Sequence, residues 1–258
     1  YGLAGDDGIG PWKLDGPGWL RLFASTGSTM DEARAMAVEG APNGSLALAR
    51  EQKAGRNRDG SPWLSPPGGL YCSMVLRSAL PPSHVGALAL ESASALLGLL
   101  AEAGIPGLEY RWPSALVHAG HDGEKRCGGI LVEFSGSAQR AEHYIVGIGL
   151  NLRAVPASGK AICGIGEFAE EAPRRAALAV ALASRLASWA ERPALLPGRW
   201  LALSPPANRE LRIRLWDGSE TRLLPAGFNE RGELVPARGG AALSIGECAE
   251  INTIGASS

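Results

Sequence analysis

The sequence predicts an α+β protein in which a small C-terminal β domain follows a larger domain of strands and helices. Apolar runs of strand length alternate with longer helix-periodic stretches through residue 195. The pattern then changes, and prolines punctuate the chain at Pro193, Pro197, Pro205 and Pro206. From Leu211 to Ile251, short strands are separated by Asp-Gly, Asn-Glu-Arg-Gly and Gly-Gly turns. We therefore expect an SH3-like β domain at residues 206–253, too small to stand alone and docked on the larger domain.

The first elements lead to a helix start that carries hydroxyl groups. Residues 1–18 are rich in Gly, Asp and Pro and are expected to form a loosely held lead-in. Trp19–Ala24 alternates like a strand, and Met30–Glu39 has the apolar period of a helix. Ser28 or Thr29 is the natural N-cap. The same hydroxyls and the free amides beside them could bind a polar ligand, so both interpretations stay open.

A cationic loop joins the next two predicted strands, Leu46–Gln52 and Leu70–Arg77. It carries Arg56 and Arg58 among glycines and shows no apolar period. Guanidinium groups and exposed amides donate to phosphate and carboxylate oxygens, so this loop is a candidate cover for an anion. An ordinary solvated surface loop is the alternative.

The remaining elements complete the larger domain, which we expect to span residues 19–195. Two helices are predicted, Val85–Ala103 and Arg174–Ala190, the first ended by a glycine. Three strands lie between them, with a hairpin-like turn at 119–124: Leu108–Trp112, Arg126–Phe134 and His143–Leu152.

Charge and composition argue against several classes of protein. The formal net charge is -1 at pH 7, so no overall field favours nucleic acid or a membrane surface, and any anion site must be local. We find no apolar run of the roughly 18 residues that span a bilayer, and no signal-peptide pattern. The four cysteines are scattered without a CxxC pair, which argues against a disulfide framework or a zinc site. We therefore expect a protein of the reducing cytoplasm.

Five segments in a fixed order resemble the motifs of the biotin protein ligases. They are GSTMDEA at 27–33, similar to the STN segment; QKAGRNRDGS at 52–61 with WLSPPGGLYCSM after it, similar to Q-x-A-G-R-G-R-R-G-R and the run that follows; RWPSAL at 111–116, similar to K-W-P-N-D-[LV]; KRCGGILVE at 125–133, similar to K-x-x-G-I-L-V-E; and VGIGLN at 146–151, similar to V-I-G-x-G-x-N. The resemblance covers about residues 20–251. No helix-turn-helix pattern precedes it, so the chain resembles a divergent member without a DNA-binding domain.

The resemblance implies a central mixed β-sheet with packed helices, a fold shared with lipoate ligases and octanoyltransferases. It also implies a two-step reaction with ATP and Mg²⁺. Biotin and ATP give biotinyl-5'-adenylate and pyrophosphate, and a lysine of a biotin carboxyl carrier protein then takes the acyl group. This chemistry needs positive charge near the carboxylate and phosphate, and it needs water kept from a mixed anhydride. A basic loop that closes over the site would supply both.

Carried across residue by residue, the resemblance implies three overlapping sets of site residues. The biotin or acyl set is Ser28, Thr29, Gln52, Gly55, Arg56, Tyr71, Gly129, Leu131 and Gly147. The nucleotide set is Arg58, Trp63, Arg111 and Asn151, and the catalytic arginines are Arg56, Arg58 and Arg126. Simpler structural roles stay open: capping for the helix-start residues, sheet core for Tyr71 and Leu131, and a strand-end turn for Asn151.

Two departures from the family pattern concern charge at the expected ATP side. Arg126 stands where the family has a lysine, while Lys125 lies one place earlier and should point to the opposite face of the strand. Arginine keeps the charge but is planar and bulkier, so the exchange is not neutral. Ser114 and Ala115 replace the Asn and Asp of K-W-P-N-D, which removes a carboxylate expected to help hold Mg²⁺. We therefore identify no metal ligand.

The loop and the helix start depart as well. Asn57, Asp59 and Ser61 replace Gly, Arg and Arg, which lowers the local charge by about three units, and Met30 replaces the Asn of STN. A replacement carboxylate could come from the 135–142 turn or from Glu124, Asp122 or Glu133. We expect these changes to weaken ATP handling more than acyl recognition.

Three functions remain open from the sequence. The first is a biotin protein ligase, slowed by the substitutions. The second is a non-catalytic binder of biotin, a related acyl compound or its adenylate. The third is a lipoate or octanoate ligase or transferase of the same superfamily, although Gln52 and Ser28–Thr29 favour a polar ureido head over an alkyl chain.

Overall fold

The computed structural model describes residues 18–105, 107–120, 123–153, 162–167, 174–195, 197, 200, 203 and 210–253. The expected lead-in lies outside these residues except for Gly18, and Asp122 also lies outside them. The strands of the larger domain are β1 (Leu20–Phe23), β2 (Ser45–Ala49), β3 (Leu70–Leu76), β4 (Leu108–Arg111), β5 (Ala115–Gly120), β6 (Gly123–Gly136) and β7 (Ala141–Leu150).

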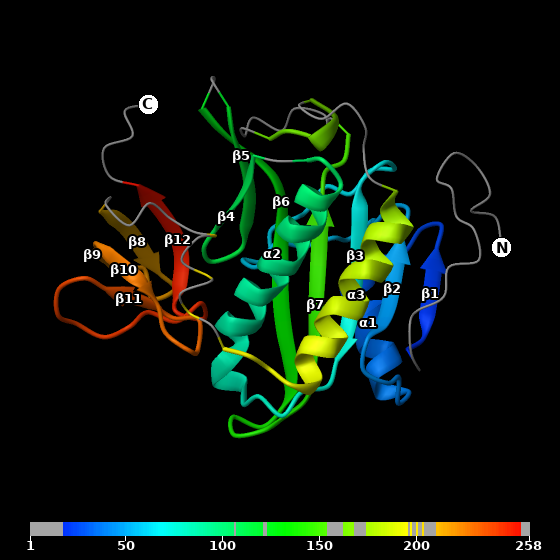
Figure 1. Cartoon of the computed structure of the whole chain (residues 1–258), viewed down its shortest axis with the longest axis horizontal. Helices are drawn as coiled ribbons and strands as arrows, with labels where there is room; N and C mark the ends of the chain where they lie inside the picture. Colours follow the sequence, from blue (N-terminus) through cyan, green and yellow to red (C-terminus); the bar gives the residue numbers. More distant parts are fainter. Residues whose placement is uncertain are drawn as a thin grey trace.

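These strands form one sheet in the order β1-β2-β3-β7-β6-β5-β4 (Figure 1). β1 and β2 are parallel, and every other neighbouring pair is antiparallel. The predicted central mixed sheet is therefore confirmed.

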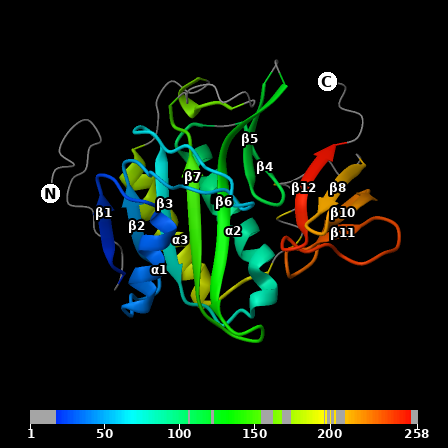
Figure 2. The same ribbon diagram turned by 180° about the vertical axis from the view of Figure 1, so that it is seen from behind.

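In the part of the chain that the structure describes, α-helices cover both faces of the sheet. α2 (Val85–Glu102) and α3 (Arg175–Glu191) pack on one face, and α1 (Thr29–Val38) packs on the other (Figures 1 and 2). Two short 3₁₀ turns are also present, η1 (Pro82–His84) and η2 (Ile165–Glu167). α1 begins at Ser28, whose Oγ accepts a hydrogen bond from the amide of Met30 at 3.3 Å.

One expectation about apolar runs was wrong. The segment Pro82–Glu102 has the length and hydropathy of a membrane span. However, 67% of its apolar 18-residue stretch is buried inside the protein, where α2 packs on β6, β4 and α3. Its apolar character is therefore that of a core helix, and the sequence pattern alone does not separate the two cases.

The sequence patterns also missed one strand, β5. Its residues ALVHAG are small or polar at several positions and follow a Pro-Ser pair, so the run lacks a clear strand pattern. β5 pairs with both β4 and β6, and the Gly120–Gly123 pair closes the hairpin expected at 119–124. Without β5, the RWPSAL motif could not be placed next to β6.

The predicted small C-terminal β domain is present. Its strands are β8 (Leu211–Leu215), β9 (Glu220–Leu223), β10 (Pro225–Phe228), β11 (Leu234–Pro236) and β12 (Cys248–Thr253), in two small sheets ordered β12-β8-β9 and β10-β11. It lies beside the β4–β5 edge of the large sheet (Figure 1). The Ala87 amide donates to the Arg231 carbonyl at 2.9 Å, and Trp112 Nε1 donates to the Gly232 carbonyl at 3.3 Å. The domain is therefore docked on α2 and on the end of β4, as expected.

Candidate active site

A pocket opens on the α1 face of the sheet. Its walls are the start of α1, the loop after β2, and strands β3, β6 and β7. The structure brings these predicted site residues to its lining: Ser28, Thr29, Gln52, Arg56, Arg58, Trp63, Arg126, Gly129, Leu131 and Gly147. Further lining residues were not predicted as site residues: Met30, Asn57, Ser73, Ser114, Ile130, Ile148 and Gly149. Strand alternation was the available signal for Ser73 and Gly149, since they lie two places from predicted pocket-face residues on β3 and β7.

One end of the pocket is a chain of neutral hydrogen-bonding groups. Gln52 Oε1 accepts from the Thr29 amide at 2.8 Å and from its hydroxyl at 3.0 Å. The Thr29 hydroxyl also lies 2.8 Å from Ser73 Oγ, and Gln52 Nε2 donates to Ser65 Oγ at 2.9 Å. Isolated β-bridges from Gln52 to Thr26 and Ser65 hold the glutamine backbone in place. This end can therefore present donors and acceptors in fixed positions to a polar, uncharged group.

Three glycines on β6 and β7 form the floor of the pocket. A Cβ on Gly147 would lie 2.4 Å from Met30 Sδ, one on Gly149 2.7 Å from Trp63 Nε1, and one on Gly129 2.8 Å from Arg126 Nη2. Gly129 pairs with Gly149, and Leu131 pairs with Gly147, so the three glycines face the same side of the sheet. Their missing side chains leave the space that lets α1 and the loop approach the sheet.

Arg126 reaches the pocket because of a β-bulge. Counting in twos from Gly129 along a regular strand would bring Lys125 to the pocket face. A register shift pairs Arg126 with Val117 but Gly128 with Leu116, so Cys127 is an extra residue that reverses the alternation. Arg126 consequently lines the pocket, with its guanidinium carbon 5.2 Å from the centre of the Trp63 ring, and Lys125 does not line it. This is the orientation expected from the sequence, although the catalytic role of Arg126 stays a prediction.

Arg56 is fixed over the start of α1. It donates to Asp31 Oδ1 at 3.1 Å and to Ser28 Oγ at 3.4 Å, and its guanidinium lies 3.6 Å from Glu133. Burial alone would raise the pKa of Asp31, but hydrogen bonds from Arg34 and Arg56 outweigh it and lower that pKa. Asp31 is therefore ionised at neutral pH and holds Arg56 at the pocket.

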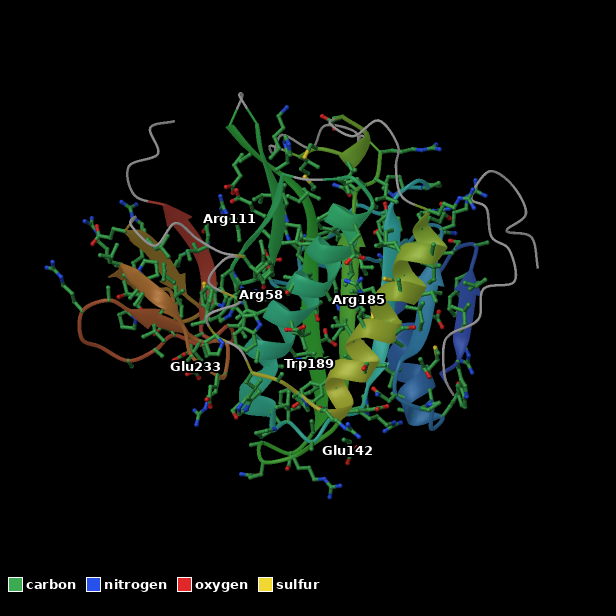
Figure 3. The ribbon with its side chains drawn as sticks, in the orientation of Figure 1. Arg58, Arg111, Glu142, Arg185, Trp189 and Glu233 are labelled. Atoms are coloured by element: carbon green, nitrogen blue, oxygen red, sulfur yellow. The ribbon has the colours of Figure 1, made fainter. Side chains whose placement is uncertain are left out.

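Arg58 connects the loop to the C-terminal domain. It donates to the Ile245 carbonyl at 3.0 Å and the Ala249 carbonyl at 3.2 Å, and its guanidinium carbon is 5.2 Å from the centre of the Trp216 ring. Figure 3 shows Arg58 at the boundary between the large sheet and that domain. Burial lowers the pKa of Arg58 and of Arg126, yet both start so far above neutrality that they carry charge. The pocket is therefore cationic on the side of the loop.

The substituted loop residues hold the loop in a tight turn. Asp59 Oδ1 accepts from the Ser61 amide at 3.0 Å and from its hydroxyl at 2.6 Å. Asn57 Nδ2 donates to the Ser61 and Pro62 carbonyls at 3.3 and 3.1 Å. A second, polar pocket adjoins the first, with Asp59, Ser114 and Arg126 in its lining. The substituted residues therefore lower the positive charge of the loop and form hydrogen bonds within it.

Four predicted site residues lie outside the lining of the main pocket. Gly55 forms a close turn in which a Cβ would lie 2.8 Å from the Trp63 carbonyl. The Tyr71 hydroxyl donates to the Pro66 carbonyl at 2.8 Å, and burial raises its pKa to about 12. Arg111, labelled in Figure 3, forms ion pairs with Glu109 and Glu124. Asn151 is buried, and its side-chain Nδ2 donates to the Cys163 carbonyl at 3.4 Å. Their predicted roles stay predictions.

Several buried polar atoms around the pocket have no hydrogen-bond partner. They are Trp63 Nε1, Asn57 Oδ1, Arg58 Nε and Asn151 Oδ1. A buried polar group without a partner costs about 1–3 kcal/mol, and such groups in native proteins call for an explanation. Trp63 Nε1 lies over the glycine floor, where a bound ligand would accept its hydrogen bond.

The described residues do not form a Mg²⁺ site of their own. Among them no three His, Cys, Asp or Glu side chains gather in a way that could hold a metal ion. Ala115 offers no carboxylate, Glu133 is paired with Arg34 and Arg56, and Glu124 is paired with Arg111. Asp59 is the carboxylate that lines the adjoining pocket. The donor set therefore does not fit a metal bound by the protein alone.

Comparison with known proteins identifies the class. Residues 22–151, about half of the chain, match the model of the biotin/lipoate A/B protein ligase family. This protein therefore belongs to that family. Within the family it is biotin protein ligase-like, because its named relatives and the solved structures that it resembles are biotin protein ligases.

The curated relatives align with this chain over only part of their length, whereas a solved structure aligns over nearly all of its length. The biotin--[acetyl-CoA-carboxylase] ligase of Paracoccus denitrificans is 38% identical over 54% of this chain and 56% of its own length. The bifunctional ligase/repressor BirA of Bacillus spizizenii is 35% identical over 48% of this chain and 38% of its own length. The biotin protein ligase of Aquifex aeolicus, solved with biotin and ATP, has a TM-score of 0.72 at 22% identity and covers 91% of this chain and 99% of that one. The chain thus spans from under two fifths to just over half of these curated relatives, and the structural likeness shows the fold.

Proposed function

We propose that this protein activates biotin with ATP to biotinyl-5'-adenylate and transfers the biotinyl group to a lysine of a cytoplasmic carrier protein. The proposed catalytic domain spans residues 19–195, and the C-terminal domain spans residues 206–253. The single observation that carries the proposal is that one pocket joins a neutral hydrogen-bonding end to a cationic end. Biotin has the same two ends, a ureido ring and a carboxylate, and the adenylate adds a phosphate at the charged end.

Each end of the pocket has its own task in this proposal. The Thr29–Gln52–Ser73 chain orients the ureido head, because its donors and acceptors are fixed by one another. Arg56 and Arg126 donate to the carboxylate and to the phosphate on which charge develops. The loop keeps water from the mixed anhydride. No step is assigned to a metal.

A second candidate, a non-catalytic binder of biotin or its adenylate, is favoured by one specific observation. Ala115 offers no carboxylate, and the described residues gather no metal-binding cluster, while the neutral end of the pocket keeps its hydrogen bonds through Gln52. In that case the protein would bind biotin or its adenylate without activating biotin with ATP.

Incubation with biotin, ATP and Mg²⁺ tests the two candidates directly. We expect slow accumulation of biotinyl-adenylate, measured by chromatography of radiolabelled product. No adenylate at high enzyme concentration would reject the ligase proposal. If calorimetry then showed biotin binding that was undiminished without ATP and Mg²⁺, the binder would stand. Lipoate outcompeting biotin in thermal stabilisation would instead point to a lipoate enzyme.

Replacing Arg56 with alanine is expected to weaken binding of a non-hydrolysable biotinyl-adenylate analogue by about 10- to 100-fold. This range corresponds to losing a charged hydrogen bond of about 1.5–3 kcal/mol. The measurement is isothermal titration calorimetry. Arg140→Ala, an exposed arginine in the β6–β7 turn, is the matched control and should leave the affinity unchanged. Equal affinities of the Arg56→Ala variant and the unaltered protein would contradict the role of Arg56.

A further inference from the structure

Two of the cysteines lie in contact beneath the cationic side of the pocket. Cys127 Sγ and Cys163 Sγ are 2.7 Å apart, closer than two unbonded sulfur atoms normally approach. Cys127 is the bulged residue of β6, and Cys163 lies in the described segment 162–167 that follows β7. Both are buried free thiols, and they are 36 positions apart in the chain.

The backbone holds the two cysteines at the spacing of a disulfide. Arg126 and Ile162 form a parallel β-bridge, and the Cys163 amide donates to the Arg126 carbonyl at 3.0 Å. Cys127 follows Arg126 in the chain, and Cys163 follows Ile162. Neighbouring strands lie about 4.7–4.9 Å apart, within the Cα separations of about 4.4–6.8 Å that disulfides span. A bond between the two sulfurs therefore needs little movement of the chain.

The other two cysteines have no such neighbour. Cys72 is enclosed in the apolar core on β3, and Cys248 lies beside Arg58 in the C-terminal domain. The short sulfur–sulfur contact is therefore a feature of this one pair in the described residues.

We propose that Cys127 and Cys163 are a redox couple that closes to a disulfide and fixes segment 162–167 against β6. In the step, the two S–H bonds break, one S–S bond forms, and two protons and two electrons leave. A peroxide accepts the electrons and is reduced to water, or a small disulfide such as oxidised glutathione is reduced to two thiols by exchange.

The position of the pair gives the bond a consequence for the site. The Asn151 amide donates to the Cys127 carbonyl at 2.7 Å, and the Asn151 side chain approaches the Cys163 carbonyl. The disulfide would thus join the two backbone segments whose carbonyls Asn151 contacts, and one of these segments adjoins Arg126. Burial raises the pKa of both thiols, so the reactive thiolate is scarce at neutral pH and the oxidation should be faster at higher pH.

Oxidation of the whole protein tests the couple. Purified protein is treated with hydrogen peroxide or with oxidised glutathione, denatured, alkylated and mapped by mass spectrometry. We expect a peptide that links Cys127 to Cys163, with the thiols of Cys72 and Cys248 alkylated. Cys127→Ser and Cys163→Ser should each remove the linked peptide, and Cys72→Ala should retain it. Four alkylated thiols after oxidation, or a link through Cys72 or Cys248, would overturn the proposal.

Thermal unfolding tests the second half of the proposal. We expect the oxidised protein to melt about 8–15 °C above its reduced form, as for closing a loop of this length in a protein of this size. The shift should reverse with dithiothreitol. A linked peptide with no change in melting temperature would reject the claim that the bond fixes segment 162–167.

Discussion

Replacing Arg126 with alanine is expected to slow the formation of biotinyl-adenylate by about 10²- to 10³-fold, the usual cost of losing one preorganised electrostatic contact. Its guanidinium lines both the main pocket and the polar pocket beside it, and it lies over the Trp63 ring. Because it is held before any ligand arrives, little reorganisation is needed when charge develops on the phosphate. The measurement is single-turnover adenylate formation, with melting temperature as a check on folding.

The neighbouring lysine supplies the control for this prediction. Lys125→Ala removes the same unit of charge one position earlier, from a side chain that does not line the pocket, and should leave the rate nearly unchanged. Arg126→Lys should recover part of the rate, since it keeps the charge but not the planar donor geometry. If Lys125→Ala were the more damaging change, the bulge at Cys127 would not set the face of β6 in solution.

Replacing Gly232 with alanine is expected to lower the free energy of unfolding by about 2–5 kcal/mol, from left-handed strain plus overpacking. Gly232 has φ +74°, and a Cβ there would lie 2.2 Å from the carbonyl carbon of Gly86 in the first turn of α2. Its carbonyl also accepts from Trp112 Nε1. The substitution should therefore push the C-terminal domain off α2. Urea unfolding measures the loss of stability.

The Gly218→Ala variant is the control that distinguishes backbone strain from the loss of domain docking. It has φ +85° in the turn between β8 and β9, and a Cβ there would meet nothing within 4 Å. Gly218→Ala should therefore cost about 1–2 kcal/mol from the left-handed backbone alone. Equal losses for the two variants would mean that the contact between Gly232 and Gly86 does not stabilise the docked domain.

We expect docking of the C-terminal domain to affect adenylate formation through Arg58. This loop arginine donates hydrogen bonds to the Ile245 and Ala249 carbonyls of the C-terminal domain. A variant that displaces the domain should consequently free the loop as well. We therefore expect the Gly232→Ala variant, measured under conditions in which it stays folded, to form adenylate more slowly than the unaltered protein.

Much of the site was readable from local patterns. The residues Ser28–Thr29, Gln52 and Gly147 were predicted from short motifs, and each lines the pocket. Ser73 was not, although alternation along β3 from Tyr71 was an available signal, because its position opposite Gly147 depends on β3 pairing with β7. Sequence spacing along one strand cannot show what the neighbouring strand brings opposite it.

The sequence by itself predicted the helices and every strand of the larger domain except β5, the change to a small β domain and the family, because these depend on local periodicity and on short motifs. The tertiary structure alone shows why Arg126 reaches the pocket and which groups from distant parts of the chain meet. The bulge at Cys127 turns Arg126 into the pocket, the docked domain holds Arg58, and the bridge from Arg126 to Ile162 brings Cys127 and Cys163 together. These are contacts between residues far apart in the chain, and they depend on register and packing that no stretch of sequence carries alone.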